Sequence, residues 1–232
     1  MTEALALTAL SKHTLAEDVT DRLRDAIFRG HFVPGQRLGE AQLARALGVS
    51  RGPIREAFNR LEREGLITSQ TNGRSLVAQL SRRDLEEVYT LRLALERLAV
   101  QRATQVATAE DFAALEANTQ ALEAAVTRAL SEEEAATLDI EFHDRLYRAA
   151  HHGQLWEAWA NIRSQVYLFL LSRNRANADY RDRSIAAAHA DLVRALRTGD
   201  QAQAVAAIEV HLRRAYEYIA QVFGEASGGR IE

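Results

Sequence analysis

Cysteine is absent from the 232 residues, which excludes disulfides, thiolate catalysis and cysteine-ligated zinc or iron–sulfur sites. Only two prolines and twelve glycines are present, and so few helix breakers favour a mostly helical protein. The longest apolar run, residues 166–171, is far too short to cross a bilayer. The N-terminal segment has no basic stretch and therefore does not resemble a secretory signal. These absences predict a cytoplasmic protein with no membrane partner.

Lysine is almost absent too, because Lys12 is the only one and arginine supplies every other basic side chain. The net charge is −3, but residues 29–76 carry eight arginines against four acidic residues. A basic segment within a mildly acidic chain indicates local contact with a polyanion. Hydrophobic residues make up 47% and charged residues 26%, which is the composition of a globular protein. The chain is long enough for two domains.

The first 80 residues combine helical periodicity with one hairpin signal. Ser50 is a good N-cap, Pro53 suits the first turn of a helix, and the Asn-Gly pair at 72–73 favours a tight hairpin turn. The pattern predicts helices over 15–28, 40–47 and 51–64 and strands over 66–68 and 75–77. This order is that of a helix-turn-helix followed by a β-hairpin wing.

From residue 84 onward there is no strand signal, and helices are expected over about 84–104, 109–128, 132–151, 154–175, 181–197 and 201–223. The fold class is therefore mostly α, with an N-terminal winged helix-turn-helix, a small β-hairpin and a C-terminal antiparallel all-α bundle. The expected domains are a flexible tail (1–14), the winged unit (15–79), a linker (80–84), the helical unit (85–223) and a disordered tail (224–232).

The second helix of the helix-turn-helix carries the candidate DNA-reading side chains. Arg51 and Arg55 are four residues apart and share one face, and the planar fork of arginine can bond a guanine edge or a phosphate. Ser50 and the first backbone N–H groups can hold a phosphate, while Gly73 and Arg74 lie at the wing tip. The alternative is that these arginines are only solvated, with Arg55 paired to Glu62 or another acid.

The helical half places three histidines and one carboxylate on inward faces of predicted helices. Asp139 and His143 are four residues apart, and His189 and His211 lie among apolar residues of two later helices. Three imidazoles and a carboxylate form a cysteine-free site suited to Zn²⁺ or a similar divalent ion. Each residue taken alone could instead be a hydrogen-bonded member of the core.

Three runs, at 34–40, 43–57 and 61–67, resemble the winged helix-turn-helix of the GntR family of bacterial transcription regulators, over roughly residues 15–78. The resemblance implies base or phosphate contacts from Ser50, Arg51, Gly52, Arg55 and Gly73. The family commonly has threonine at the position of Gly52. Without that hydroxyl, the contact is lost or made by backbone, and the operator preference could be shifted.

Four ordered pieces in the second half, at 85–96, 139–146, 189–200 and 211, resemble the helical effector domain of the FadR subfamily. The resemblance implies that Asp139, His143, His189 and His211 are metal ligands, with zinc most expected and nickel or another divalent ion as alternatives. It also implies that Arg92 faces a cavity and binds a small carboxylate effector. The alternative for Arg92 is an intrahelical pair with Glu96.

These observations predict a homodimeric regulator, a repressor rather than an activator, that binds a double-stranded DNA operator and responds to a small carboxylate. No enzymatic activity is expected. Two alternatives remain at this point. One is a metal-dependent hydrolase that uses the His/Asp cluster to activate water. The other is a metal-free DNA-binding dimer whose helical half is purely structural.

Overall fold

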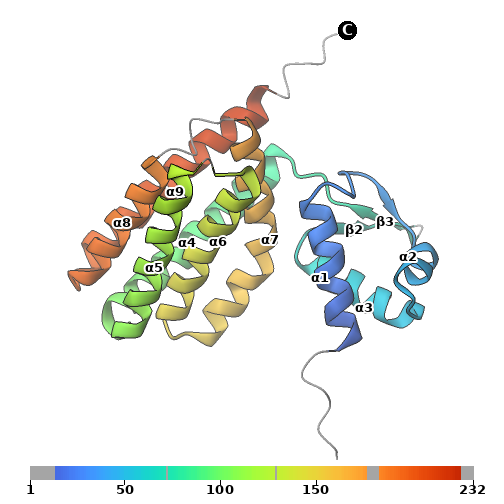
Figure 1. Cartoon of the computed structure of the whole chain (residues 1–232), viewed down its shortest axis with the longest axis horizontal. Coiled ribbons are helices and arrows are strands. Elements are labelled where there is room, and N and C mark those ends of the chain that lie inside the picture. The colour runs from blue at the N-terminus through green and yellow to red at the C-terminus, as the bar shows by residue number, and fades with distance from the viewer. Residues whose placement is uncertain (1–13, 72, 129, 177–182, 226–232) are drawn as a thin grey trace, which may run out of the picture. The chain divides into compact units, whose positions relative to one another are not determined.

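The computed structural model describes residues 14–71, 73–128, 130–176 and 183–225, and its ribbon is shown in Figure 1. The chain divides into two compact units, residues 1–79 and 80–232. The first unit combines helices with a small sheet, and the described part of the second contains helices and no strand. No helix among the described residues is long and apolar enough to span a membrane.

The N-terminal unit consists of α1 (Leu15–Phe28), β1 (Arg37–Leu38), α2 (Glu40–Leu47), α3 (Arg51–Arg63), β2 (Ile67–Ser69) and β3 (Ser75–Val77). The strands form an antiparallel sheet in the order β1-β3-β2, so the predicted hairpin is joined by a third strand. Strand β1 was not predicted, because two residues are too few to show an alternating pattern.

Local signals in the sequence fix the ends of these helices. Thr14 and Glu17 form a reciprocal capping box at the start of α1, in which the Glu17 carboxylate accepts from the Thr14 N–H at 2.8 Å. Gly48 adopts a left-handed φ of +67° and ends α2, which allows α3 to begin three residues later. The apolar face of α3, including the fully buried Ile54 and Leu61, then packs against α1.

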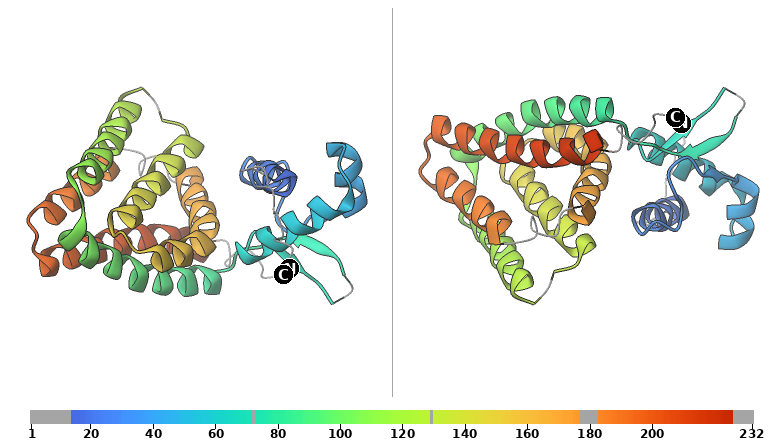
Figure 2. Two further views of the ribbon diagram at one scale, coloured as in Figure 1. Left: turned by 90° about the horizontal axis from the view of Figure 1, so that it is seen from below. Right: turned by 90° about the horizontal axis from the view of Figure 1, so that it is seen from above.

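The C-terminal unit consists of α4 (Arg82–Val106), α5 (Ala109–Thr127), α6 (Glu132–Ala149), α7 (Gly153–Ala176), α8 (Arg183–Arg197) and α9 (Gln201–Glu225). The long helices α4 and α9 run side by side, as both views of Figure 2 show. Helix α6 packs against α4, α5 and α7, and its Phe142 and Tyr147 are completely buried. This arrangement agrees with the predicted all-helical second half.

The predicted linker over 80–84 is wrong in extent, because α4 already begins at Arg82. Ser81 caps this helix by accepting from the Asp84 N–H, and the Asp84 carboxylate accepts from the Ser81 N–H at 2.7 Å. The predicted boundaries of the two tails, at residues 14 and 224, are also wrong. Thr14 is the N-cap of α1 and α9 continues to Glu225, while residues 1–13 and 226–232 lie outside the described residues.

Candidate functional site

The N-terminal unit exposes a row of side chains at the start of α3. Ser50 is the N-cap of this helix, but its hydroxyl makes no capping hydrogen bond. Ser50, Arg51, Gly52 and Arg55 are all exposed, whereas the opposite face of α3 is buried. The start of α3 therefore offers a hydroxyl, unpaired helix N–H groups and two guanidinium groups on one solvent-facing surface.

Arg55 pairs with Glu40 at the start of α2, with 2.9 Å between Nε and Oε2. The sequence had suggested Glu62 or another acid as its partner, and the observed acid is Glu40 rather than Glu62. The Arg55 side chain remains 63% exposed in this pair. An exposed ion pair contributes at most about 1 kcal/mol, so Arg55 can exchange Glu40 for a stronger anion at little cost.

The wing is formed by the loop between β2 and β3. The Gly73 N–H donates to the Gln70 carbonyl at 2.9 Å, and Gly73 has a φ of +73° that disfavours other residues. Gly73 and Arg74 are both exposed, while Asn72 lies outside the described residues. The two described members of the predicted wing tip thus face solvent on the same unit as α3.

In the C-terminal unit, α6, α8 and α9 bring the four predicted metal ligands together. One donor atom from each of Asp139, His143, His189 and His211 lies within 4.8 Å of every other. Nε2 of His143 is 3.3 Å from Nε2 of His211 and 3.5 Å from Oδ1 of Asp139. Asp139, His143 and His189 are buried, and His211 is partly buried. The i,i+4 spacing on α6 places Asp139 and His143 on one inward face.

The protonation states of His189, His211 and Asp139 favour metal coordination. Burial lowers the pKa of His189 to about 3, and burial together with His189 lowers the pKa of His211 well below its usual value. Burial opposes ionisation of Asp139, but contacts with His143 and the charge of Arg173 outweigh it and hold its pKa well below the usual range. Two neutral imidazoles and an ionised carboxylate are the ligand forms that a divalent cation requires.

Further buried side chains contact these ligands and hold them in position. Nδ1 of His143 lies 2.8 Å from Oε2 of Glu96, and Nη2 of Arg173 donates to Oδ2 of Asp139 at 3.1 Å. Burial lowers the pKa of His143, but the negative charge of Glu96 outweighs it and the pKa is raised. Carboxylates behind a histidine ligand fix its ring orientation in metal sites. Arg173 was not predicted as part of this site, because nothing in its sequence spacing marks it as buried.

The donor set fits a divalent transition metal. Three imidazoles and one carboxylate match the ligands of zinc sites. Neither ring nitrogen of His189, which is completely buried, has a hydrogen-bond partner in the described part of the chain. A buried polar group without a partner is destabilising, and a coordinated cation would satisfy it. His143, His189, His211 and Asp139 are therefore the residues that would hold such an ion.

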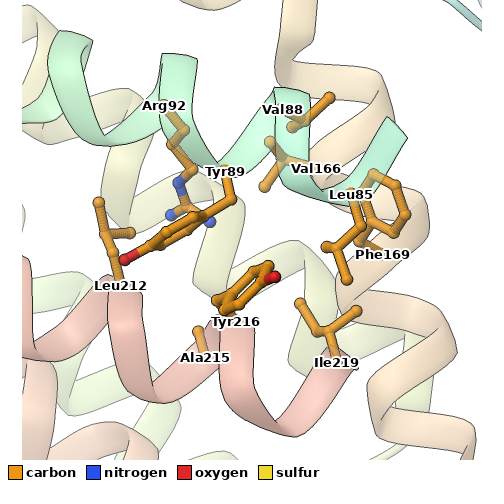
Figure 3. Close-up of a pocket in the computed structure, with 10 residues that line it drawn as sticks. All are labelled: Leu85, Val88, Tyr89, Arg92, Val166, Phe169, Leu212, Ala215, Tyr216 and Ile219. Carbon is orange, nitrogen blue, oxygen red and sulfur yellow. The ribbon is translucent and has the colours of Figure 1, made fainter. Parts of the chain in front are cut away.

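A pocket between α4, α7 and α9 lies beside this cluster's supporting residues and contains Arg92, as Figure 3 shows. The Arg92 Nε donates to Oε1 of Glu96 at 2.5 Å, so the intrahelical pair considered from the sequence is present. Arg92 also lines the pocket, which the resemblance implied. The two expectations for Arg92 are compatible, because one guanidinium has several N–H groups. Glu96 thereby links the pocket arginine to His143.

An exposed winged helix-turn-helix and a helical unit with a buried His/Asp cluster define a class of DNA-binding regulator. Residues 15–77 match the bacterial regulatory proteins of the gntR family, and residues 87–214 match the FCD domain. The chain therefore belongs to the GntR-family regulators that carry an FCD domain. The family and the relatives of this chain are DNA-binding transcription regulators and not enzymes, so the hydrolase alternative is not supported.

The chain is 28% identical over 205 residues to the uncharacterized HTH-type transcriptional regulator YdhC of Bacillus subtilis, covering 88% of this chain and 91% of that protein. It is 30% identical over 206 residues to the "Probable D-xylose utilization operon transcriptional repressor" of Paenarthrobacter nicotinovorans, covering 88% of each. The solved structure of E. coli McbR/YncC superposes with a TM-score of 0.77 at 23% identity, over 90% of this chain and 98% of that one. This last similarity supports the fold alone.

Proposed function

We propose that this protein is a homodimeric transcriptional repressor in the bacterial cytoplasm, whose operator binding responds to a small carboxylate held beside a divalent metal ion. The observation that carries the proposal is the presence in one chain of an exposed arginine-bearing α3 and a buried three-histidine, one-aspartate cluster. Repression rather than activation is supported by the description of a relative as a probable repressor.

The proposed DNA contacts are Ser50, Arg51, Gly52 and Arg55 on α3, with Gly73 and Arg74 on the wing. All six are exposed, and the two α3 arginines can bond guanine edges or phosphates bidentately. Two copies of the chain would place two α3 helices in successive major grooves of a roughly palindromic operator. Because phosphate contacts release counterions, the affinity for DNA should fall steeply with salt concentration.

The proposed sensor is the C-terminal unit. Asp139, His143, His189 and His211 would bind Zn²⁺, or Ni²⁺ or another divalent ion, and Arg92 would bind the effector carboxylate. An effector shifts the DNA-binding equilibrium only when it binds one arrangement of the dimer more tightly than another. The metal ion and the carboxylate are therefore expected to change operator affinity without touching DNA.

A single experiment tests this function. Duplexes that the purified protein retains are selected from a random library, and their affinity is measured by fluorescence anisotropy with and without Zn²⁺ and a panel of small carboxylates. A fall in operator affinity with a carboxylate, in wild type but not in His143→Ala, is the expected result. Operator binding that no carboxylate or metal alters would favour the alternative of a purely structural helical unit. Retention of no duplex would overturn the proposal.

A further inference from the structure

Helix α4 lies at the edge of the helical unit in both views of Figure 2 and has exposed apolar side chains on one face. Leu91 and Leu98 are 47% and 40% exposed, whereas Val100 on the opposite face is completely buried. Ala94 lies between the two leucines and is also exposed. Single apolar residues are common at protein surfaces, but a row of them along one helix indicates a surface that binds another molecule.

The spacing of this row is that of a coiled-coil seam. The residues that follow one another at intervals of four, three, four and three positions are Glu87, Leu91, Ala94, Leu98 and Gln101. Such alternating intervals keep the side chains on one face of a helix and allow a second helix to pack along them. The row therefore fits a second helix better than it fits a small ligand.

Charged residues of opposite sign lie at the two ends of the apolar row. Glu87 is 63% exposed and forms an exposed ion pair with Arg83 of the same helix. Arg102 is partly exposed, and its buried Nε has no hydrogen-bond partner in the described part of the chain. An exposed ion pair exchanges partners at little cost, so the Glu87 carboxylate is available to an arginine of another chain.

These charges favour a second copy of the same helix in the antiparallel direction. Where two such helices cross just after Ala94, Leu91 of one copy faces Leu98 of the other, because both lie equally far from the crossing point. Glu87 of one copy faces Arg102 of the other for the same reason, and two-fold symmetry forms this pair twice. A parallel arrangement would instead bring like charges together at both ends of the row.

We propose that two copies of this chain associate through α4, which packs antiparallel against itself along Leu91, Ala94 and Leu98 and is flanked by two pairs of Glu87 with Arg102. The inference rests on the proposed function, which is dimeric, and it names the surface that joins the two copies.

The proposed interface lies on the opposite face of α4 from the candidate metal site. Glu96 of α4 is completely buried, and its Oε2 lies 2.8 Å from Nδ1 of His143. The two faces of one helix move together, so a shift of α4 at the metal site would also alter the packing between the two copies. The same helix begins at Arg82, directly after the N-terminal unit.

Charge reversal tests the proposed ion pairs, with the dimer dissociation constant of the full-length protein measured by sedimentation equilibrium. Glu87→Arg and Arg102→Glu are each expected to weaken dimerisation at least about tenfold, because each places like charges together twice in one dimer. The double variant restores opposite charges and should dimerise within about threefold of wild type. Glu86→Arg, at an exposed position outside the row, is the matched control and should dimerise like wild type.

Cysteine crosslinking locates the crossing point, and the absence of native cysteine leaves no competing thiol. Ala94→Cys places the thiols of the two copies near the two-fold axis. Oxidation with copper phenanthroline should convert most of this variant into a disulfide-linked dimer on a non-reducing gel. Ala206→Cys, at an exposed position of α9, is the matched control and should run as a monomer.

The remaining outcomes separate this inference from the proposed function. A wild-type dimer that neither charge reversal weakens, or whose Ala94→Cys variant does not crosslink, would overturn the inference and leave the function to another dimer surface. A double variant as weak as the single variants would overturn the antiparallel pairing. Wild type that stays monomeric at every concentration would overturn both the inference and the dimeric function. A dimer joined through α4 that retains no duplex would support the inference and overturn the function.

Discussion

The two units keep the arginines of their proposed sites in opposite environments. The Arg55 side chain is 63% exposed and bound to a single surface acid, Glu40. In the C-terminal unit, the side chains of Arg92 and Arg173 are 7% and 1% exposed and are bound to buried carboxylates. An exposed ion pair exchanges partners readily, whereas breaking a buried one strands a charge away from water. The first environment suits transient contact with DNA, and the second suits a site built before its ligand arrives.

The largest effect should come from the buried pair between Arg173 and Asp139. Replacing Arg173 with methionine leaves the Asp139 carboxylate without its compensating charge, and we expect the free energy of unfolding to fall by about 3–5 kcal/mol. Urea denaturation of the metal-free protein measures this loss. Arg175→Met is the matched control, because the exposed Arg175–Glu133 pair should contribute less than about 1 kcal/mol. Equal losses in both variants would contradict the contrast between the two environments.

The exposed arginines of the N-terminal unit should affect DNA binding and leave stability unchanged. Arg51→Ala and Arg55→Ala are each expected to weaken operator binding by about 1–3 kcal/mol because each guanidinium can read a base edge. Anisotropy with operator and random duplexes measures the change, and Arg63→Ala near the end of α3 is the control for lost charge. An equal loss on both duplexes would mean that Arg51 and Arg55 contact phosphates only.

The pH dependence of stability should report on the buried His189 of the C-terminal unit. His189 has a pKa of about 3 when folded and near 6.5 when unfolded, so the unfolded chain binds the extra proton between these values. Stability from the neutral His189 is therefore complete above pH 6.5 and is lost as the pH falls toward 3. At pH 5 we expect metal-free wild type to lose about 2 kcal/mol more than His189→Gln, relative to pH 7.5. Parallel losses in the two proteins would contradict this.

The smallest effect concerns Gly52, where the resemblance to the family leads us to expect threonine. A Cβ at this position would meet only the Ser50 Oγ, at 3.8 Å, so a larger side chain fits. Gly52→Thr is expected to raise operator affinity by up to about 1 kcal/mol by adding a hydroxyl near the phosphates. Gly52→Ala separates this gain from the helix stabilisation that any Cβ brings. An equal gain in both variants would show that the hydroxyl makes no contact.

Much of the N-terminal unit could be predicted from the sequence because its determinants are local. The ends of α2 and the start of α3 depend on Gly48 and Ser50, which sequence patterns mark directly. Strand β1 and the Glu40–Arg55 pair depend on contacts between segments distant in sequence. No local pattern reports such contacts, so β1 was not predicted, and the pairing of Arg55 with an acid was considered without singling out Glu40.

In the candidate metal site, too, local features could be predicted from the sequence and contacts between helices could not. The spacing of Asp139 and His143 predicted a shared face, and the apolar neighbours of His189 predicted burial. Their meeting with His211 within 4.8 Å is a property of helix packing that periodicity cannot supply. Arg173 and the contact between Glu96 and His143 were not predicted. Charged residues are rarely buried, so a buried one reads in the sequence as an ordinary surface residue.

The most direct test of the account is a zinc titration of chelator-treated wild type and His189→Ala, with duplex retention measured on the same samples. We predict one tightly bound ion per wild-type chain, at least 100-fold weaker zinc binding by the variant, and equal retention of operator DNA by both without effector. Wild type that binds no zinc, or a variant that binds it equally well, would contradict the proposed sensor. Loss of DNA binding in the variant would contradict the separation of the two units.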